Sequence, residues 1–196
     1  MTPQVDARLS DLLDPLRDVA VGELLQGLAE ELEKGAEVVP EPVLRDAAGR
    51  VVRDGALSLP RRGDIAVTKG GRTLVRRIES PEPRRFEPLC LVSEAGFTTV
   101  VSPFRWEAAE MVVETHQERP DWTPLRHWFL EWFQPRFGEL APDLDGAVHG
   151  LTGPQAGPEG IRLTLDFGSA PLGAFAAMLQ AMEETGALRV RIGHEV

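Results

Sequence analysis

The sequence predicts an α+β fold: an N-terminal helix, an antiparallel β-meander and a C-terminal half with the order β-α-β-β-α-β. Two observations carry this prediction. Apolar residues keep a helical spacing until Gly35, after which short apolar runs are separated by glycine-containing turns. From residue 104 onward, helical and strand-like periodicities follow one another.

The N-terminal helix begins with Asp14-Pro15, an N-cap residue followed by proline at the first helical position. Apolar residues then recur about every 3.6 positions from Leu16 to Leu32. Gly35 ends the helix because glycine readily takes the left-handed conformation that closes a last turn. We expect a shorter helical segment, roughly Asp6–Leu13, to precede it, so that the first 35 residues are helical.

Residues 37–103 are expected to form the meander. Apolar runs flank three turns that contain glycine, which supplies the positive φ of short hairpins. Prolines fall between these runs or at their ends, where no ladder hydrogen bond is lost. The expected strand pairs are Val43-Leu44 with Val51-Val52, Ile65–Val67 with Thr73–Val75, and Leu89–Leu91 with Phe97–Val101.

The C-terminal half is expected to contain two helices, over Thr123–Phe133 and from Ser169-Ala170-Pro171 to Gly186. Strict alternation predicts strands at Ile161–Phe167 and Leu188–Ile192, with a short strand around Val148. The glycine- and proline-rich segment 150–160 is expected to be a flexible connection.

Residues 107–115 suit either a strand or a helix, and the alternation of Met111, Val113 and Thr115 favours a strand. With a strand there, residues 104–196 have the ferredoxin-like order β-α-β-β-α-β. The chain then divides into 1–103 and 104–196, or forms one continuous domain.

The charge of the chain is strongly negative. Thirty-one acidic residues against 21 basic ones give −10, which makes nucleic acid or an anionic membrane a poor partner. We expect no signal peptide, because residues 1–14 have neither a basic region nor an apolar one, and the sequence has no run of about 18 apolar residues. The single cysteine, Cys90, excludes a disulfide framework and is expected to be a small buried hydrophobe. We therefore expect a cytoplasmic protein.

No complete catalytic signature occurs in the sequence: GxSxG, Walker A and HExxH motifs are absent. The four histidines, at 116, 127, 149 and 194, lack metal-ligand spacing. We therefore expect no enzyme, no catalytic residue, no metal and no cofactor.

Eight of the chain's 12 aromatic residues lie between positions 104 and 137, interleaved with acidic ones. Most of these aromatic side chains are expected in the core, and Trp122 is the best candidate for an exposed anchor. Acidic side chains steer association with a basic partner. The candidate partner-binding residues are Glu107, Glu110, Glu114, Glu118, Asp121, Trp122, Asp143 and Asp145.

In overall type, and in the segments Ser102–Glu107, Trp128–Phe133 and Asp166–Ser169, the chain resembles immunity proteins of bacterial polymorphic-toxin systems. The resemblance implies that the chain binds a cognate toxin stoichiometrically and neutralises it without any catalytic residue. The partner it implies is a basic toxin domain. Two alternatives stay open. One is a structural or adaptor subunit of a bacterial assembly, and the other is an enzyme with an unrecognised site near His149 and the glycine-rich segment after it.

Overall fold

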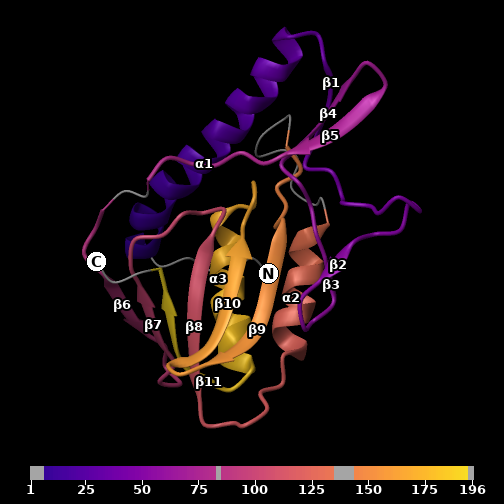
Figure 1. The fold of residues 1–196 in the computed structure, drawn as a ribbon. Coiled ribbons are helices and arrows are strands. Elements are labelled where there is room, and N and C mark those ends of the chain that lie inside the picture. The colour runs from indigo at the N-terminus through magenta and orange to yellow at the C-terminus, as the bar shows by residue number, and fades with distance from the viewer. Residues whose placement is uncertain (1–6, 83–84, 135–143, 194–196) are drawn as a thin grey trace.

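The largest element of the computed structural model, which describes residues 7–82, 85–134 and 144–193, is a mixed six-stranded sheet (Figure 1). Its strand order is β6-β7-β11-β8-β10-β9. Neighbouring strands are antiparallel except β7 and β11, which are parallel. The strands are β6 (Leu89–Val92), β7 (Thr98–Val101), β8 (Ala109–Thr115), β9 (Gly150–Gly157), β10 (Gly160–Asp166) and β11 (Ala187–Ile192).

Helices α2 (Thr123–Phe133) and α3 (Leu172–Glu184) pack against each other on one face of this sheet (Figure 1). The strand residues that point toward them are buried, for example Met111 and Val113 on β8. The alternate residues of β10, Arg162 and Thr164, are exposed on the opposite side. We call that side the open face of the sheet.

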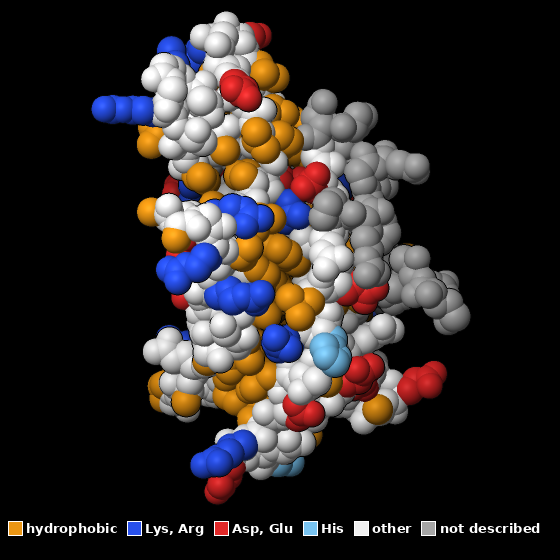
Figure 2. Space-filling view, turned by 90° about the vertical axis from the view of Figure 1, so that its right-hand side faces the viewer, with side chains coloured by type: hydrophobic (Ala, Val, Ile, Leu, Met, Phe, Trp, Pro, Cys, Tyr) orange, Lys and Arg blue, Asp and Glu red, His pale blue; other side chains and the backbone are white. Residues whose placement is uncertain are grey.

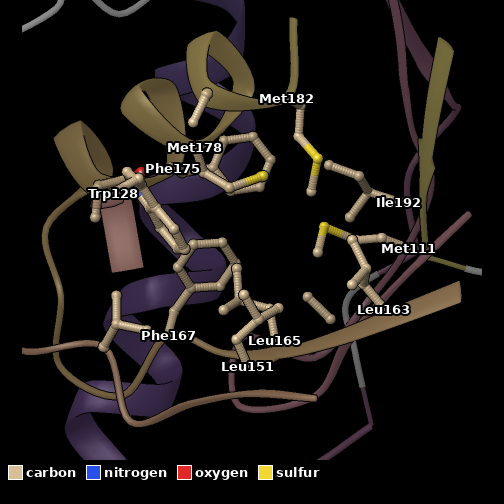
Figure 3. Packing of buried hydrophobic residues seen from close by; sticks show 14 of the residues in the cluster. Met111, Trp128, Leu151, Leu163, Leu165, Phe167, Phe175, Met178, Met182 and Ile192 are labelled. Atoms are coloured by element: carbon tan, nitrogen blue, oxygen red, sulfur yellow. The ribbon is translucent and has the colours of Figure 1, made fainter. Parts of the chain in front are cut away.

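The main core lies between the sheet and the two helices (Figure 3). The Trp106 and Phe167 rings stack with their centroids 4.5 Å apart, and Phe175 of α3 lies 5.4 Å from Phe167. On α2 the buried residues include Leu125 and Trp128. This aromatic packing confirms the sequence prediction of an aromatic core, and it closes one face of the sheet to solvent.

A small three-stranded sheet lies against the C-terminal part of α1 (Ala7–Glu33), at the top of Figure 1. Its order is β1 (Glu37–Pro40), β4 (Ile65–Lys69) and β5 (Arg72–Arg76). Val21, Leu24 and Leu28 of the helix pack with Ile65 in a second apolar cluster. A two-stranded hairpin, β2 (Arg53–Asp54) with β3 (Leu59–Pro60), lies between β1 and β4 in the chain.

The expected helix start at Asp14-Pro15 is wrong, because α1 runs from Ala7 through Pro15 without interruption. Pro15 removes one intrahelical hydrogen bond. The burial of apolar side chains before and after Pro15 offsets that loss. Leu9, Leu13 and Leu16 all pack into the main core.

The expected meander is only partly correct. The hairpins β4–β5 and β6–β7 form as predicted, with Val67 opposite Leu74 and Cys90 opposite Val100. However, β6 and β7 extend the large sheet, because β7 pairs with the distant β11. Around Val43 and Val51 the described chain has isolated bridges in place of the expected strand pair.

Several C-terminal strand expectations are confirmed, but the short strand around Val148 is wrong, because the nearby strand β9 begins only at Gly150. Residues 109–115 form a strand, and Ile161–Phe167 and Leu188–Ile192 contribute to one sheet. The expectation of a flexible connection at 150–160 is wrong, because this segment forms β9 and the turn into β10. The large sheet includes strands from both sides of residue 103, because β7 pairs with β11 from the C-terminal half.

Among the described helices, none has both the length and the apolar character needed to cross a membrane.

Candidate functional site

His149 lies between two carboxylates in the interior of the protein. Its Nε2 atom is 2.7 Å from Oε1 of Glu41, and its Nδ1 atom is 3.0 Å from Oδ1 of Asp64. Asp166 is nearby, with Oδ1 at 3.9 Å from Nδ1. Only 1% of His149 is exposed. Together with Ser169, which contacts Glu41, these residues form what we call the His149 cluster.

Chain segments far apart in sequence meet at this cluster. Glu41 directly follows β1, Asp64 precedes β4, and His149 precedes β9. The His149 backbone joins the segments, since its N–H donates to the Asp166 carbonyl and its carbonyl accepts from the Arg62 N–H, both at 2.9 Å. The imidazole is therefore held at both its backbone and its ring.

Glu41 is held by several donors. Its Oε1 accepts hydrogen bonds from the Ser169 hydroxyl at 2.5 Å and the Ser169 N–H at 3.3 Å, and its Oε2 accepts one from the Asp145 N–H. Arg62 secures the same segment by donating to the Glu41 carbonyl and to the Asp145 carboxylate, each at 2.6 Å. A buried carboxylate needs such partners, because leaving water is unfavourable for its charge.

The hydrogen bonds of the cluster shift the ionisation of its members. Burial opposes a charged imidazole, but the bonds to Asp64 and Glu41 outweigh it and raise the pKa of His149 from 6.5 to about 10. Burial also works against an ionised Glu41, yet His149 and Ser169 hold the pKa of its carboxyl below 4.5. Burial raises the pKa of Asp166 to about 6, against the opposing charge of His149. At neutral pH the His149 ring is therefore protonated and carries a positive charge.

A hollow of about 680 Å³ lies on the open face, and Asp166 lines it as well as belonging to the His149 cluster. The floor comes from β8, β9 and β10, including Val112, Thr152 and Thr164. Its charged lining residues are Arg61, Arg77, Glu107, Glu110, Glu159, Arg162, Asp166 and Arg191. The hollow thus combines both signs of charge and shares Asp166 with the His149 cluster.

Basic and hydrophobic side chains lie together on one side of the molecule. Figure 2 shows the side that lies to the right in Figure 1, where blue basic side chains lie beside orange hydrophobic ones. Red acidic side chains are present on the same side.

Three of the acidic residues singled out from the sequence come together near the hollow. Glu107 and Glu110 line it, and Glu114 lies further along β8 with its Oε1 at 3.4 Å from Nε of Arg191. Glu107 is buried, and its Oε1 accepts a hydrogen bond from the Ser80 N–H at 3.1 Å.

The other predicted residues lie apart from these. Glu118 and Asp121 are exposed in the connection between β8 and α2, and Asp121 accepts a hydrogen bond from the Thr123 N–H. Trp122 is half-buried and packs against the main core. Asp145 pairs with Arg62 beside the His149 cluster. Asp143 lies outside the described residues.

Sequence reasoning missed Glu41, Asp64 and Asp166 as partners of His149. No short spacing connects them, and only the fold brings them together. The Asp64, His149 and Asp166 ligand atoms lie within 4.8 Å of one another, a grouping that the expectation of no metal did not foresee.

Ser169 and His149 do not form a nucleophile-base pair. The Ser169 hydroxyl donates to Glu41, while both ring nitrogens of His149 face carboxylates. In a Ser-His pair, a free imidazole nitrogen accepts the hydroxyl proton. Cys90, expected to be buried, is exposed on the edge strand β6. Side chains alternate along a strand, and here Leu89 and Leu91 pack against the main core while Cys90 points to the other face.

Comparison of the chain with family models, with curated proteins and with solved structures finds no match.

Proposed function

We propose that the chain is a non-catalytic protein-binding protein that neutralises a cognate bacterial toxin in the cytoplasm by stoichiometric binding. The observation that carries the proposal is the open face of the large sheet, with its hollow and its exposed charged side chains. The opposite face is closed by α2 and α3, so the open face is where this sheet can meet a partner.

The hollow suits a protein surface of mixed charge. Four arginines and four carboxylates line it, so its formal charges balance. Paired charges of this kind fix the orientation of a partner and exclude wrong ones, more than they steer a partner from a distance. Steering of a basic toxin would come from the net charge of −10 on the whole chain.

The scaffold for this binding is a ferredoxin-like half. Its strand order, β11-β8-β10-β9 with antiparallel neighbours and α2 and α3 as connections, supports that assignment. Such a sheet presents residues from several strands in one rigid plane. Rigid presentation reduces the entropy lost when a partner binds.

The proposal is tested by capturing partners from the native host with the full chain as bait. The matched pair of baits is Arg162→Glu on the open face and Arg126→Glu on the exposed side of α2, which carry the same change of charge. We expect the wild-type and Arg126→Glu chains to capture a secreted toxin as a one-to-one complex. Arg162→Glu should lose most of it.

The captured protein must then arrest growth when expressed alone, and coexpression of this chain must restore growth. Capture of a protein that is harmless to the cell would contradict toxin neutralisation. Equal capture by both variants would contradict the open face as the binding surface.

A further inference from the structure

Three possible metal ligands converge beside the hollow of the open face. The His149 Nδ1 atom lies 3.0 Å from Oδ1 of Asp64 and 3.9 Å from Oδ1 of Asp166. Ligand atoms around a four- to six-coordinate ion with bonds of about 2.0–2.1 Å lie roughly 3 to 3.4 Å from each other. All three ligand atoms lie within 4.8 Å of one another, so the set is close to that spacing.

The surroundings of His149 resemble the outer shell that metal-binding histidines require. The ring nitrogen that would not bind the ion, Nε2, faces Glu41 at 2.7 Å. Such a carboxylate accepts the second ring N–H, fixes the tautomer and raises the basicity of the other nitrogen. Ser169 in turn donates to Glu41 through its hydroxyl and its backbone.

Both candidate carboxylates are also held in place. The Ile78 N–H donates to Oδ2 of Asp64 at 2.6 Å, which leaves Oδ1 directed at the imidazole. The Gly168 N–H donates to Oδ1 of Asp166 at 3.0 Å. Because these donors are backbone groups, the ligand set needs no large rearrangement to receive an ion.

Charge balance also favours a cation. With every carboxyl group ionised, Glu41, Asp64 and Asp166 place three negative charges around one imidazole. A protonated imidazole compensates one of them and Arg77 acts on Asp166 from the hollow, whereas a divalent ion at the three ligands compensates two. The Asp166 side chain is 21% exposed and lines the hollow, so an ion has a path from solvent.

We propose that Asp64, His149 and Asp166 bind a divalent transition-metal ion, Zn²⁺ or Mn²⁺. Two carboxylates and one imidazole suit these ions better than Mg²⁺ or Ca²⁺, which prefer oxygen ligands alone. On binding, the Nδ1 proton of His149 leaves to solvent and its lone pair bonds to the ion. Nε2 keeps its proton, which Glu41 accepts. Water from the hollow completes the coordination.

The site is tested on the full chain, purified with a chelator and then dialysed, by calorimetric titration with ZnCl₂ or MnCl₂ near neutral pH. We expect one ion per chain for one of these salts, and at least tenfold weaker binding for Asp166→Asn. Glu159→Gln removes a carboxylate from the same hollow but not from the ligand set, and it should bind like the wild type. His116→Ala, which removes an exposed histidine, should also bind normally.

A second measurement needs no variant. Addition of a small amount of Mn²⁺ should broaden the imidazole NMR signals of His149 before those of the exposed His116 and His127. Absence of saturable binding by either ion would overturn the proposal. So would wild-type affinity in a folded Asp166→Asn chain, or broadening of His116 or His127 first.

Discussion

The Nε2 atom of His149 lies 2.7 Å from the Oε1 atom of Glu41, and neither side chain is more than 1% exposed. The pair connects the segment after β1 to the segment before β9, across a sequence separation of 108 residues. This long-range contact connects the part of the chain that contains α1 and the small three-stranded sheet to the large sheet. Each partner compensates the buried charge of the other.

Replacing His149 by alanine should destabilise the fold, because Glu41 would keep a buried charge without its cationic partner. Breaking a buried ion pair in this way costs about 3–5 kcal/mol. The matched control is His116→Ala, at an exposed position, which should change the free energy of unfolding by less than about 0.5 kcal/mol. Urea unfolding of both variants near neutral pH measures the difference, and equal stabilities would contradict the role of this pair.

The stability of the metal-free protein should fall as pH rises from about 7 to about 9.5. The folded-state pKa of His149 is raised to about 10, so its contribution is complete below 6.5 and declines toward 10. Few other groups titrate in this window, since the chain has no tyrosine, one cysteine and two lysines. Urea unfolding in a chelating buffer measures the trend, and a constant or rising stability would contradict the charged imidazole.

Gly168→Ala should be more destabilising than Gly70→Ala. Both glycines have positive φ, 52° and 58°, so both substitutions introduce backbone strain of about 1 kcal/mol. At Gly168 the added Cβ would also lie 2.2 Å from the His149 ring, whereas nothing lies within 4 Å at Gly70. Thermal unfolding compares the two, and similar melting temperatures would show that the ring is not fixed where the structure has it.

Phe167→Ala should lower the free energy of unfolding by about 3–5 kcal/mol, because it leaves a cavity against Trp106 and Phe175. Val92→Ala, on the exposed edge strand β6, should change it by less than about 0.5 kcal/mol. Urea unfolding monitored by tryptophan fluorescence measures both. A small effect at Phe167 would contradict the aromatic core.

Local features of the fold could be predicted from the sequence. The alternation at Ile161–Phe167 and the spacing of Leu125, Trp128 and Trp132 each follow from one buried face, which periodicity reveals directly. Long-range pairing could not be predicted in the same way. The parallel contact of β7 with β11 depends on strands separated by most of the C-terminal half, and no turn signal encodes it.

The partners of His149 could not be predicted from the sequence for the same reason. Glu41, Asp64 and Asp166 look like ordinary surface acids, since the chain has 31 acidic residues and none of these three shares a motif with His149. A weak signal existed in Asp166-Phe167-Gly168-Ser169, whose glycine has φ of 52° and permits the close approach of the imidazole.

The open face is tested most directly by the affinity of Arg162→Glu and Arg126→Glu for the toxin captured from the native host. Both arginines are exposed and both variants carry the same change of charge, so the net charge of the chain does not distinguish them. If the open face binds the toxin, Arg162→Glu weakens the complex by at least about tenfold, or 1.4 kcal/mol, while Arg126→Glu changes it less than about twofold. Equal affinities, or a larger loss for Arg126→Glu, would contradict binding at the open face.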